Sequence, residues 1–192
     1  EDSIRTFMIT YYLSDDTLSI YEPMQRNTGI IGGKFLGRKK VPGITPKSLF
    51  VGAEVDICSH RFELTGTDEA TLRFMESRPR DFTLADANVV LHKLRLAILA
   101  KHVHIRDAFR SVDTDHSGNI TYDEFKILIQ SLGVELFDQE VITIMRYFDK
   151  TSKGFISYGD FCDAILPQDY TPGKLHSTTM EDAIHEMASE DE

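Results

Sequence analysis

The sequence has few cysteines and no long hydrophobic run, and both shortages narrow the class of protein. The two cysteines, Cys58 and Cys162, are far apart in apolar settings, which predicts two buried free thiols and favours a reducing compartment. No apolar run approaches the roughly 18 residues that a membrane-spanning helix needs. A secretory hydrophobic segment is also lacking, and because the first residue is Glu, we read the chain as part of something longer.

Catalytic and nucleotide-binding motifs are lacking as well, although residues 26–40 (RNTGIIGGKFLGRKK) combine glycines with basic side chains. A phosphate loop of the form G-x-x-x-x-G-K-[ST] needs a hydroxyl after its lysine, and no register of these glycines completes it. The dinucleotide pattern G-x-G-x-x-G is absent too. We therefore expect Gly29, Gly32, Gly33 and Gly37 to permit bends, bulges or close backbone approach in a curved sheet.

Charge divides the chain into two unlike halves. The total is −10, and residues 1–82 carry −1 of it while residues 83–192 carry −9. Because nucleic acid is itself negatively charged, the acidic second half argues against it as a partner. Hydrophobic residues at 41% and charged residues at 27% are typical of a globular protein.

The first half has the alternating pattern of strands. FMITYYL and TLSIYE are separated by the turn residues SDD, which predicts a hairpin over residues 7–22. LFVGAEVDI and HRFEL predict a second hairpin that turns near Ser59 and His60. These segments indicate a small antiparallel sheet or a partly closed barrel.

The second half changes to helical periodicity. Apolar residues recur at helical spacing from Leu84 to Phe109, and TLAD places Thr83 and Asp86 as an N-terminal capping box. Either one long helix or two helices broken near Lys101 would satisfy the pattern.

The segment DTDHSGNITYDE, residues 113–124, has the spacing of an EF-hand calcium loop. Such a loop places oxygen ligands at positions 1, 3, 5, 7, 9 and 12 and a glycine at position 6. Gly118 occupies position 6, and hard oxygen ligands of this kind favour calcium over zinc. The predicted ligands are Asp113, Asp115, Ser117, the carbonyl of Asn119, Thr121 through water, and bidentate Glu124.

A second loop, DKTSKGFISYGD at residues 149–160, keeps the frame but loses ligands. Lys153 puts a cation where an oxygen ligand belongs, and Asp160 is shorter than the usual Glu. We predict that this loop is metal-free and that calcium occupies one site. The 36 residues between Asp113 and Asp149 match a paired EF-hand lobe.

The last segment places Met180, Ile184 and Met187 on one face of a short helix. This helix is either an internal ligand of the lobe's groove or part of a frayed acidic tail.

Two blocks of the first half carry a resemblance to a known family. YYLSDDTLSIYEPMQRNTGIIGGKFLGRKKV and SLFVGAEVDICSHRFELTGTDEATLRFMES closely resemble the DM-ten (DM10) domain of the myoclonin-like axonemal EF-hand proteins, over residues 6–78. The resemblance implies a pleckstrin-homology-like barrel with a capping helix, which serves as a binding module on ciliary doublet microtubules. It brings no catalytic residue. It also implies a further strand upstream, without which a sheet edge would be exposed.

Basic side chains gather in one part of this half: Lys34, Arg38, Lys39, Lys40 and Lys47. They are either a contact for the acidic surface of tubulin or an ordinary solvated loop.

Together these observations predict an α+β chain, with a small antiparallel pleckstrin-homology-like β-barrel module followed by an all-α paired EF-hand lobe. The predicted boundaries are a DM-ten module at 1–82, a connecting helix at 83–102, the lobe at 103–167 and an acidic tail at 168–192.

The preferred function is a non-enzymatic microtubule inner protein of the cilium or flagellum axoneme, with tubulin and other inner proteins as partners and neither nucleic acid nor membrane. The alternatives are a calcium sensor whose lobe captures a target helix, or the regulatory piece of an enzyme such as a nucleotide kinase.

Overall fold

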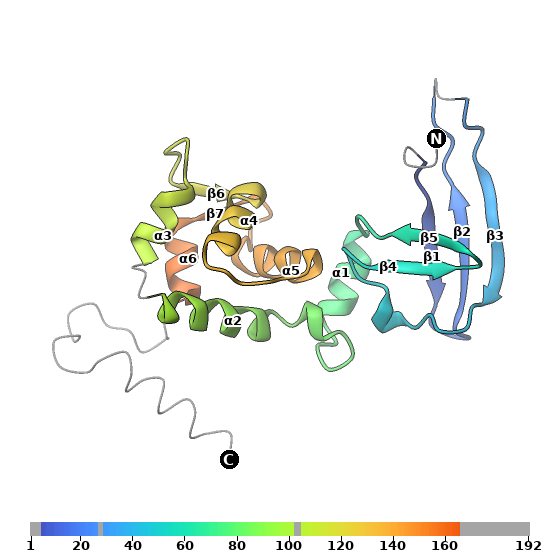
Figure 1. Cartoon of the computed structure of the whole chain (residues 1–192), viewed down its shortest axis with the longest axis horizontal. Helices are drawn as coiled ribbons and strands as arrows, with labels where there is room; N and C mark the ends of the chain where they lie inside the picture. Colours follow the sequence, from blue (N-terminus) through green and yellow to red (C-terminus); the bar gives the residue numbers. More distant parts are fainter. Residues whose placement is uncertain (1–4, 27–28, 102–104, 166–192) are drawn as a thin grey trace, which may run out of the picture.

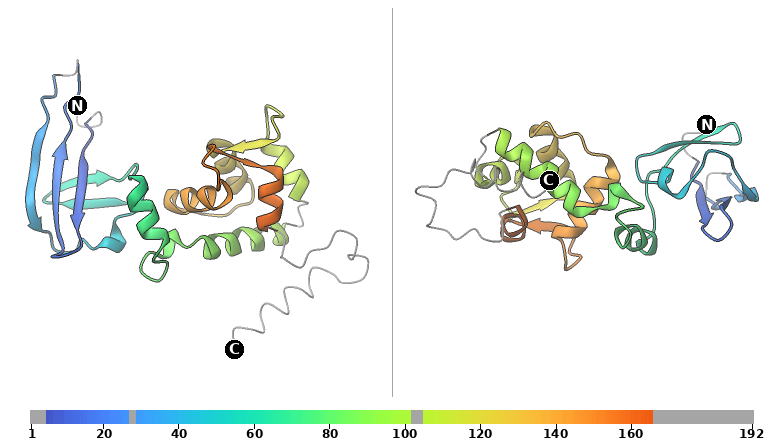
Figure 2. Two further views of the ribbon diagram at one scale, coloured as in Figure 1. Left: turned by 180° about the vertical axis from the view of Figure 1, so that it is seen from behind. Right: turned by 90° about the horizontal axis from the view of Figure 1, so that it is seen from below.

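The computed structural model describes residues 5–26, 29–101 and 105–165, which form two bodies lying end to end (Figure 1). The first body, the β module, spans residues 5–76, and the second, the helical lobe, spans residues 87–165. Figure 2 shows the same arrangement from behind and from below. The mixed α+β class predicted from the sequence is confirmed.

Two antiparallel sheets build the β module. Its strands are β1 (Met8–Tyr12), β2 (Thr17–Glu22), β3 (Gly33–Lys40), β4 (Glu54–Ile57) and β5 (His60–Glu63). The first three form one sheet in the order β1-β2-β3, and β4 pairs with β5 in the other. Both predicted hairpins are therefore confirmed. Alternation along β2 decides which side chains are buried. Leu18 and Ile20 are each 1% exposed, while Tyr21, which points to the opposite face of the strand, is 51% exposed.

The turn between β4 and β5 corrects one prediction. Cys58 and Ser59 connect the strands with φ values of 52° and 68°, as a tight two-residue hairpin turn requires. The turn places Cys58 in solvent, and Cys162 is only half-buried. The prediction of two buried thiols is thus wrong, because the apolar neighbours of Cys58 alternate inward along the strands while the turn itself projects outward.

The predicted pleckstrin-homology-like barrel is not confirmed, since the two sheets are not closed into one. Residues 41–53, which include the short 3-10 helix η2 (Pro46–Ser48), separate β3 from β4. Side chains rather than backbone ladders hold the sheets together. The buried core that they share consists of Leu18, Ile20, Val41, Ala53, Val55, Ile57 and Phe62. Helix α1 (Glu69–Glu76) follows the second sheet, with Asp68 as its N-cap.

Residues 29–40 form strand β3 and the segment that leads into it. The pairing of β2 with β3 shifts register twice, between Leu18 and Ile20 and between Ile20 and Tyr21, as bulges do. Before the strand, Gly32 has a φ of 75°, and a Cβ on it would lie 2.5 Å from the carbonyl oxygen of Glu22. The expectation of bulges and close backbone approach is met at this position.

We expect Gly32→Ala to destabilise the β module by about 2–4 kcal/mol, because the added methyl group meets backbone and the residue keeps a left-handed φ. Gly29→Ala is the matched control, since Gly29 has a φ of 78° but nothing within 4 Å of its Cβ position. It should cost about 1 kcal/mol. Urea unfolding of both variants measures the difference, and equal losses would contradict the close approach.

The helical lobe follows a short 3-10 helix, η3 (Thr83–Ala85). Its elements are α2 (Ala87–Ala100), α3 (Ile105–Val112), β6 (Asn119–Thr121), α4 (Tyr122–Ser131), α5 (Asp138–Phe148), β7 (Phe155–Ser157) and α6 (Tyr158–Ile165). Of the two alternatives for residues 84–109, two helices are described: α2 ends at Ala100, Lys101 is in a turn, and α3 begins at Ile105, with residues 102–104 outside the described residues.

The predicted capping box at Thr83 and Asp86 is wrong by one turn. Thr83 belongs to η3, and Asp86 itself caps α2 by accepting a hydrogen bond from the backbone N–H of Asn88 at 3.0 Å. Asp86 could either lie three residues inside a helix that begins at Thr83 or serve as the N-cap of a later helix. It is the N-cap, because residues 83–85 form a tighter 3-10 turn and the α-helix begins after them.

Helix α2 is part of the lobe's core. Four of its apolar side chains are at most 4% exposed: Val90, Leu91, Leu94 and Ile98. They join the cluster that also holds the aromatic side chains of the other helices: Phe109, Phe125, Phe148 and Phe161. The segment predicted as a connecting helix therefore also covers the apolar face of the lobe.

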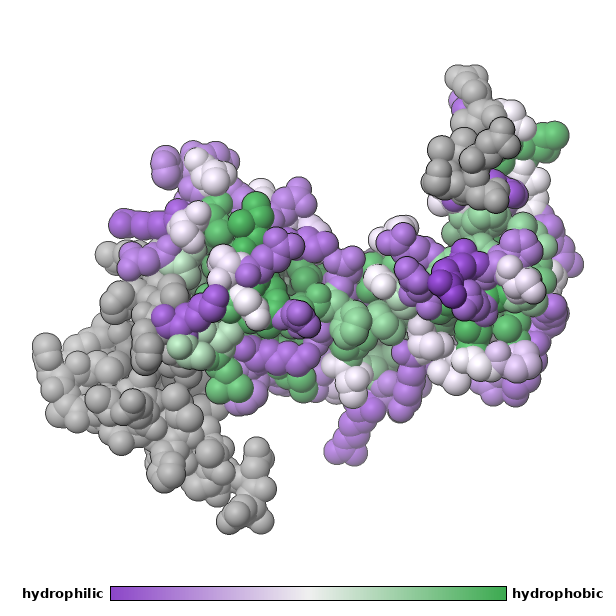
Figure 3. Space-filling view, in the orientation of Figure 1, coloured by the Kyte–Doolittle hydropathy of each residue, from purple (hydrophilic) through white to green (hydrophobic). Residues whose placement is uncertain are grey.

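The surface of both bodies is mixed, with polar and apolar residues interspersed over the visible face (Figure 3). In the described parts of the chain, no helix combines the length and apolar character that crossing a bilayer requires. The predicted helix with Met180, Ile184 and Met187 lies outside the described residues.

Candidate metal centre

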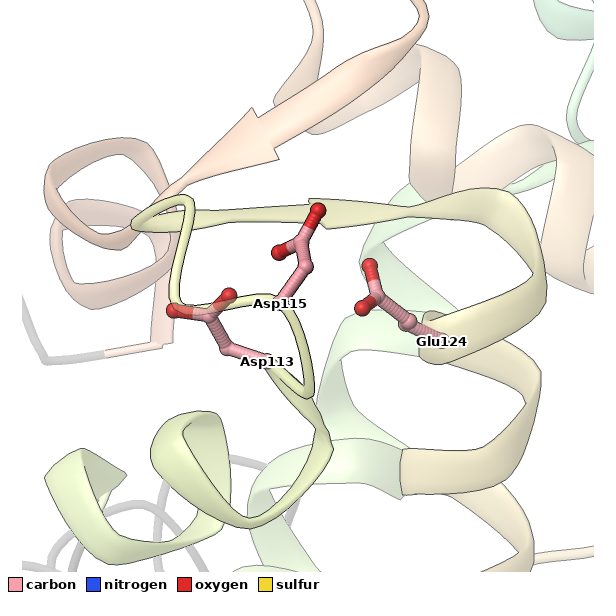
Figure 4. Close-up of side chains that lie close together, drawn as sticks. All are labelled: Asp113, Asp115 and Glu124. Atoms are coloured by element: carbon pink, nitrogen blue, oxygen red, sulfur yellow. The ribbon is translucent and has the colours of Figure 1, made fainter.

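Three carboxylates converge in the first loop, between the end of α3 and the start of α4 (Figure 4). Each of Asp113, Asp115 and Glu124 offers an oxygen, and these oxygens lie within 4.8 Å of one another. Calcium binds oxygens at about 2.3–2.6 Å, so two ligands on opposite sides of the ion are about 4.6–5.2 Å apart. The spacing of the three carboxylates therefore fits one calcium ion.

Backbone N–H groups hold the first aspartate in place. The carboxylate of Asp113 accepts hydrogen bonds from the N–H of Ser117 at 2.9 Å and from that of Gly118 at 3.0 Å. Gly118 has a φ of 75°, which lets the loop turn sharply enough to aim its N–H inward. Asp113 is only 7% exposed, so its orientation is set before any ion arrives.

Glu124 closes the loop from the first turn of α4. Its Oε2 accepts hydrogen bonds from the N–H and the hydroxyl of Thr121, both at 2.9 Å, and its Oε1 accepts one from the Thr114 hydroxyl at 3.2 Å. The Thr121 N–H lowers the pKa of Glu124 below its ordinary value, and the Ser117 N–H and hydroxyl do the same for the pKa of Asp115. Both groups are therefore ionised at neutral pH, the state that binds calcium.

The other predicted ligands lie in the same loop. The hydroxyl of Ser117 donates to the carbonyl oxygen of Asn119 at 3.2 Å, which places these two oxygens side by side. The hydroxyl of Thr121 is instead engaged with Glu124 and caps α4. Coordination by Ser117, Asn119 and Thr121 stays a prediction.

The second loop has the same backbone hydrogen bonds to its first aspartate as the first loop but different side chains at the ligand positions. Asp149 accepts hydrogen bonds from the N–H of Lys153 at 3.0 Å and from that of Gly154 at 2.6 Å. The ammonium of Lys153 lies over the ring of Phe155, 6.0 Å from its centroid. Among the described residues, a group of three acidic, histidine or cysteine ligands occurs in the first loop alone. The prediction that this second loop is metal-free stands untested.

A short sheet joins the two loops. Strand β6 pairs with β7 through Asn119 and Ser157, Ile120 and Ile156, and Thr121 and Phe155. Ile120 and Ile156 are both fully buried, so the apolar side chain at position 8 of each loop connects the two hands.

The predicted basic cluster is partly neutralised within the module. Arg38 pairs with Asp15 at 2.8 Å and stacks on Tyr12 at 3.8 Å, and Lys40 pairs with Asp16 at 3.5 Å. Within the part of the chain that the structure describes, three exposed lysines form no ion pair: Lys34, Lys39 and Lys47.

Sequence reasoning missed a set of polar residues on α5. Gln139, Glu140 and Thr143 are at most 2% exposed, and Glu140 accepts hydrogen bonds from Lys93 of α2 at 2.6 Å and from the N–H of Phe137 at 3.0 Å. A signal for Glu140 was present, because it precedes the buried Ile144 by four residues and so shares its helix face.

Comparisons with known protein families identify two domains in the chain. Residues 1–71 match the DM10 domain, and residues 103–166 match the EF-hand domain pair. The chain thus combines a DM10 domain with an EF-hand pair, as predicted.

Relatives with the same combination extend over most of this chain. It is 32% identical to EF-hand domain-containing family member C2 of Danio rerio over 82% of this chain and 23% of that protein. It is 31% identical to EF-hand domain-containing protein 1 of Homo sapiens over 85% of this chain and 32% of that protein. The chain therefore spans a third or less of these two relatives.

A smaller part of the chain is similar to proteins that are named as enzymes. Calcium-dependent protein kinase 11 of Oryza sativa subsp. japonica is 34% identical over 40% of this chain and 14% of its own length. This similarity is confined to the EF-hand region.

Proposed function

We propose that this chain is a non-enzymatic structural component of the doublet microtubules of cilia and flagella, placed among the microtubule inner proteins, and that its lobe binds one calcium ion at residues 113–124. The DM10 domain would dock on tubulin or on other inner proteins. The combination of domains, which the chain shares with the C2 and protein 1 relatives, supports this assignment.

The position of α2 is the main observation that favours a structural role over that of a calcium sensor. An EF-hand sensor exposes an apolar groove on binding calcium and captures a target helix there. In this lobe Val90, Leu94 and Ile98 of the chain's own α2 are buried in the common core. A sensor would first have to expel a covalently attached helix, so the arrangement favours a lobe that clamps its own chain over one that captures a target.

Calcium is the ion that the first loop suits. Its carboxylates converge at the spacing of a calcium sphere, and the remaining predicted ligands are hydroxyl and carbonyl oxygens, which hard cations prefer. We expect an affinity on the order of 10⁻⁷ to 10⁻⁵ M, as for sensor-type loops.

The β module is the proposed docking part. Its two packed sheets and the following α1 are consistent with a relative of the pleckstrin-homology barrel whose sheets are not joined. Lys34 and Lys39 on β3 and Lys47 in η2 keep exposed positive charge that would face the acidic surface of tubulin.

The docking proposal is tested by microtubule co-sedimentation of the intact chain. The double variant Lys34→Glu and Lys39→Glu should bind about tenfold more weakly, because it reverses two of the exposed charges proposed to contact tubulin. Lys150→Glu with Lys153→Glu makes the same change of net charge on the second EF-hand loop and should bind as the unchanged chain does. Equal co-sedimentation of all three proteins would remove Lys34 and Lys39 from the proposed contact.

A further inference from the structure

Helix α5 carries the polar contacts between the two bodies. Among the described residues, every hydrogen bond or ion pair that joins residues 5–85 to residues 105–165 has its lobe partner on α5. The contacts fall at the start of the helix and along its second half. The position of the β module relative to the lobe is therefore set through one helix of the EF-hand pair.

At its start, α5 holds the segment that enters β4. The N–H of Gln139 donates to the carbonyl of Val51 at 3.1 Å, and the N–H of Val51 donates to Oε1 of Gln139 at 3.2 Å. Beside this pair the rings of Phe50 and Phe137 meet edge to face, with centroids 5.4 Å apart. The two hydrogen bonds and the ring contact fix both the distance and the orientation of the segment.

Further along, Arg146 binds α1 of the β module. Its guanidinium donates to Glu76 at 2.6 Å and to Glu69 at 2.6 Å, and these two carboxylates raise the pKa of Arg146. Planar guanidinium groups bind carboxylates with defined geometry, so this contact orients α1 as well as attracting it.

The junction is polar and incompletely filled. A cleft of about 790 Å³ lies between α1 and α5, with Glu69, Glu76, Asp86 and Arg146 among its lining residues. The Nε2 of buried Gln139 has no hydrogen-bond partner among the described residues. Interfaces of this kind between domains are weaker than a domain core, so a modest free energy can shift them.

A short path connects this junction to the calcium loop. Glu124 and Lys126 both lie on α4, and the ammonium of Lys126 pairs with Asp138, the first residue of α5, at 2.5 Å. Asp138 lies beside Gly52, so that a Cβ added to Gly52 would be 3.3 Å from the Cβ of Asp138. The final calcium ligand is therefore linked to the β module through one helix and one ion pair.

We propose that calcium binding at residues 113–124 and docking of the β module on α5 are positively coupled, so that each strengthens the other. The proposal rests on the calcium site of the proposed function. In the docked arrangement the three carboxylates already converge within 4.8 Å, so the docked state is a state that can bind calcium. Undocking removes the contacts that hold α5 on the side of the β module, and the Lys126–Asp138 ion pair transmits this loss to α4, which carries Glu124.

Coupling of this kind is reciprocal. If releasing the module lowers calcium affinity by some factor, calcium must tighten docking by the same factor. We expect a factor of about five or more, the lower end of known couplings between sites.

The test uses calorimetric calcium titrations of the intact chain and of Arg146→Gln, which removes the contact with α1 without touching the calcium loop. Arg73→Gln is the matched control, because Arg73 binds the same Glu69 from within α1, at 2.8 Å, and does not reach the lobe. A second junction variant, Glu69→Gln with Glu76→Gln, breaks the contact from the module side.

Docking is measured separately by the distance between two spin labels. One label is placed on the exposed Cys58 and the other on Gln130→Cys in α4, in a Cys162→Ser background. In the otherwise unchanged chain the distribution of distances should be narrow, Arg146→Gln should broaden it, and calcium should narrow it again.

Calcium binding at least fivefold weaker in both junction variants, with Arg73→Gln unchanged, supports the coupling. A broadened distance distribution with calcium affinity unchanged within twofold overturns the coupling while leaving the calcium site intact. If the junction variants do not broaden the distribution, the assignment of docking to Arg146 is wrong. If the unchanged chain binds no calcium, the calcium part of the proposed function fails, and the coupling fails with it.

Discussion

Glu124→Gln is expected to weaken calcium binding by the intact chain about 100-fold or more, since changes to groups that merely support a metal ligand already cost 10–100-fold. Glu124 is the one proposed ligand that supplies two oxygens, and it closes the loop from α4. The substitution keeps the size of the side chain and removes its charge. An isothermal titration of the two proteins measures the change.

The control for this prediction lies at the same position of the second loop. Asp160→Asn also removes a carboxylate charge at position 12, where Asp160 binds the Ser157 hydroxyl at 2.5 Å. We expect it to leave calcium binding unchanged, because Lys153 stands among the would-be ligands of that loop. A comparable loss in both variants would place the ion, or a second ion, in the other hand.

Leu94→Ala should lower the free energy of unfolding of the lobe by about 2–5 kcal/mol. Leu94 is 0% exposed and belongs to the common core, so its removal leaves a cavity between α2 and the EF-hand helices. Helix propensity does not explain such a loss, because Ala is the better helix former. Urea unfolding of the intact chain measures the loss.

Leu96→Ala tests whether the loss arises from the buried face of α2. Leu96 lies on the same helix and is 46% exposed, so the same chemical change should cost less than about 1 kcal/mol. Similar losses in the two variants would show that α2 does not form part of the core.

The parts of the fold that the sequence predicted are those that depend on local spacing. Alternation and turn residues predicted both hairpins, and the six-ligand spacing with Gly118 predicted a loop whose three acids do converge. The spacing of the second loop predicted that it pairs with the first, and the structure shows this pairing between Ile120 and Ile156.

The parts that sequence reasoning did not predict depend on contacts between distant residues. Whether two sheets close into a barrel is decided by where residues 41–53 run, and periodicity within strands does not report this. The neutralisation of Arg38 by Asp15 crosses 23 positions, and the contact of Arg146 with Glu69 crosses 77. Ion pairs between exposed residues so far apart leave no pattern in the sequence from which they could be predicted.

The position of α2 links the fold to the proposed function. Its periodicity predicted a helix but not the surface that the helix covers, because any apolar stripe can pack on several partners. Since α2 shares a core with α5 and α6, it already covers apolar side chains of those helices that a target helix could otherwise contact. This arrangement also explains why calcium would act on the junction with the β module rather than on a captured partner.

Fluorescence of a hydrophobic dye, recorded for the intact chain with and without calcium, tests the central claim most directly. A lobe whose groove is filled by its own α2 should bind calcium with little or no gain in dye fluorescence. A large, calcium-dependent gain that disappears in Glu124→Gln would show that the groove opens, and it would contradict the structural role in favour of a sensor.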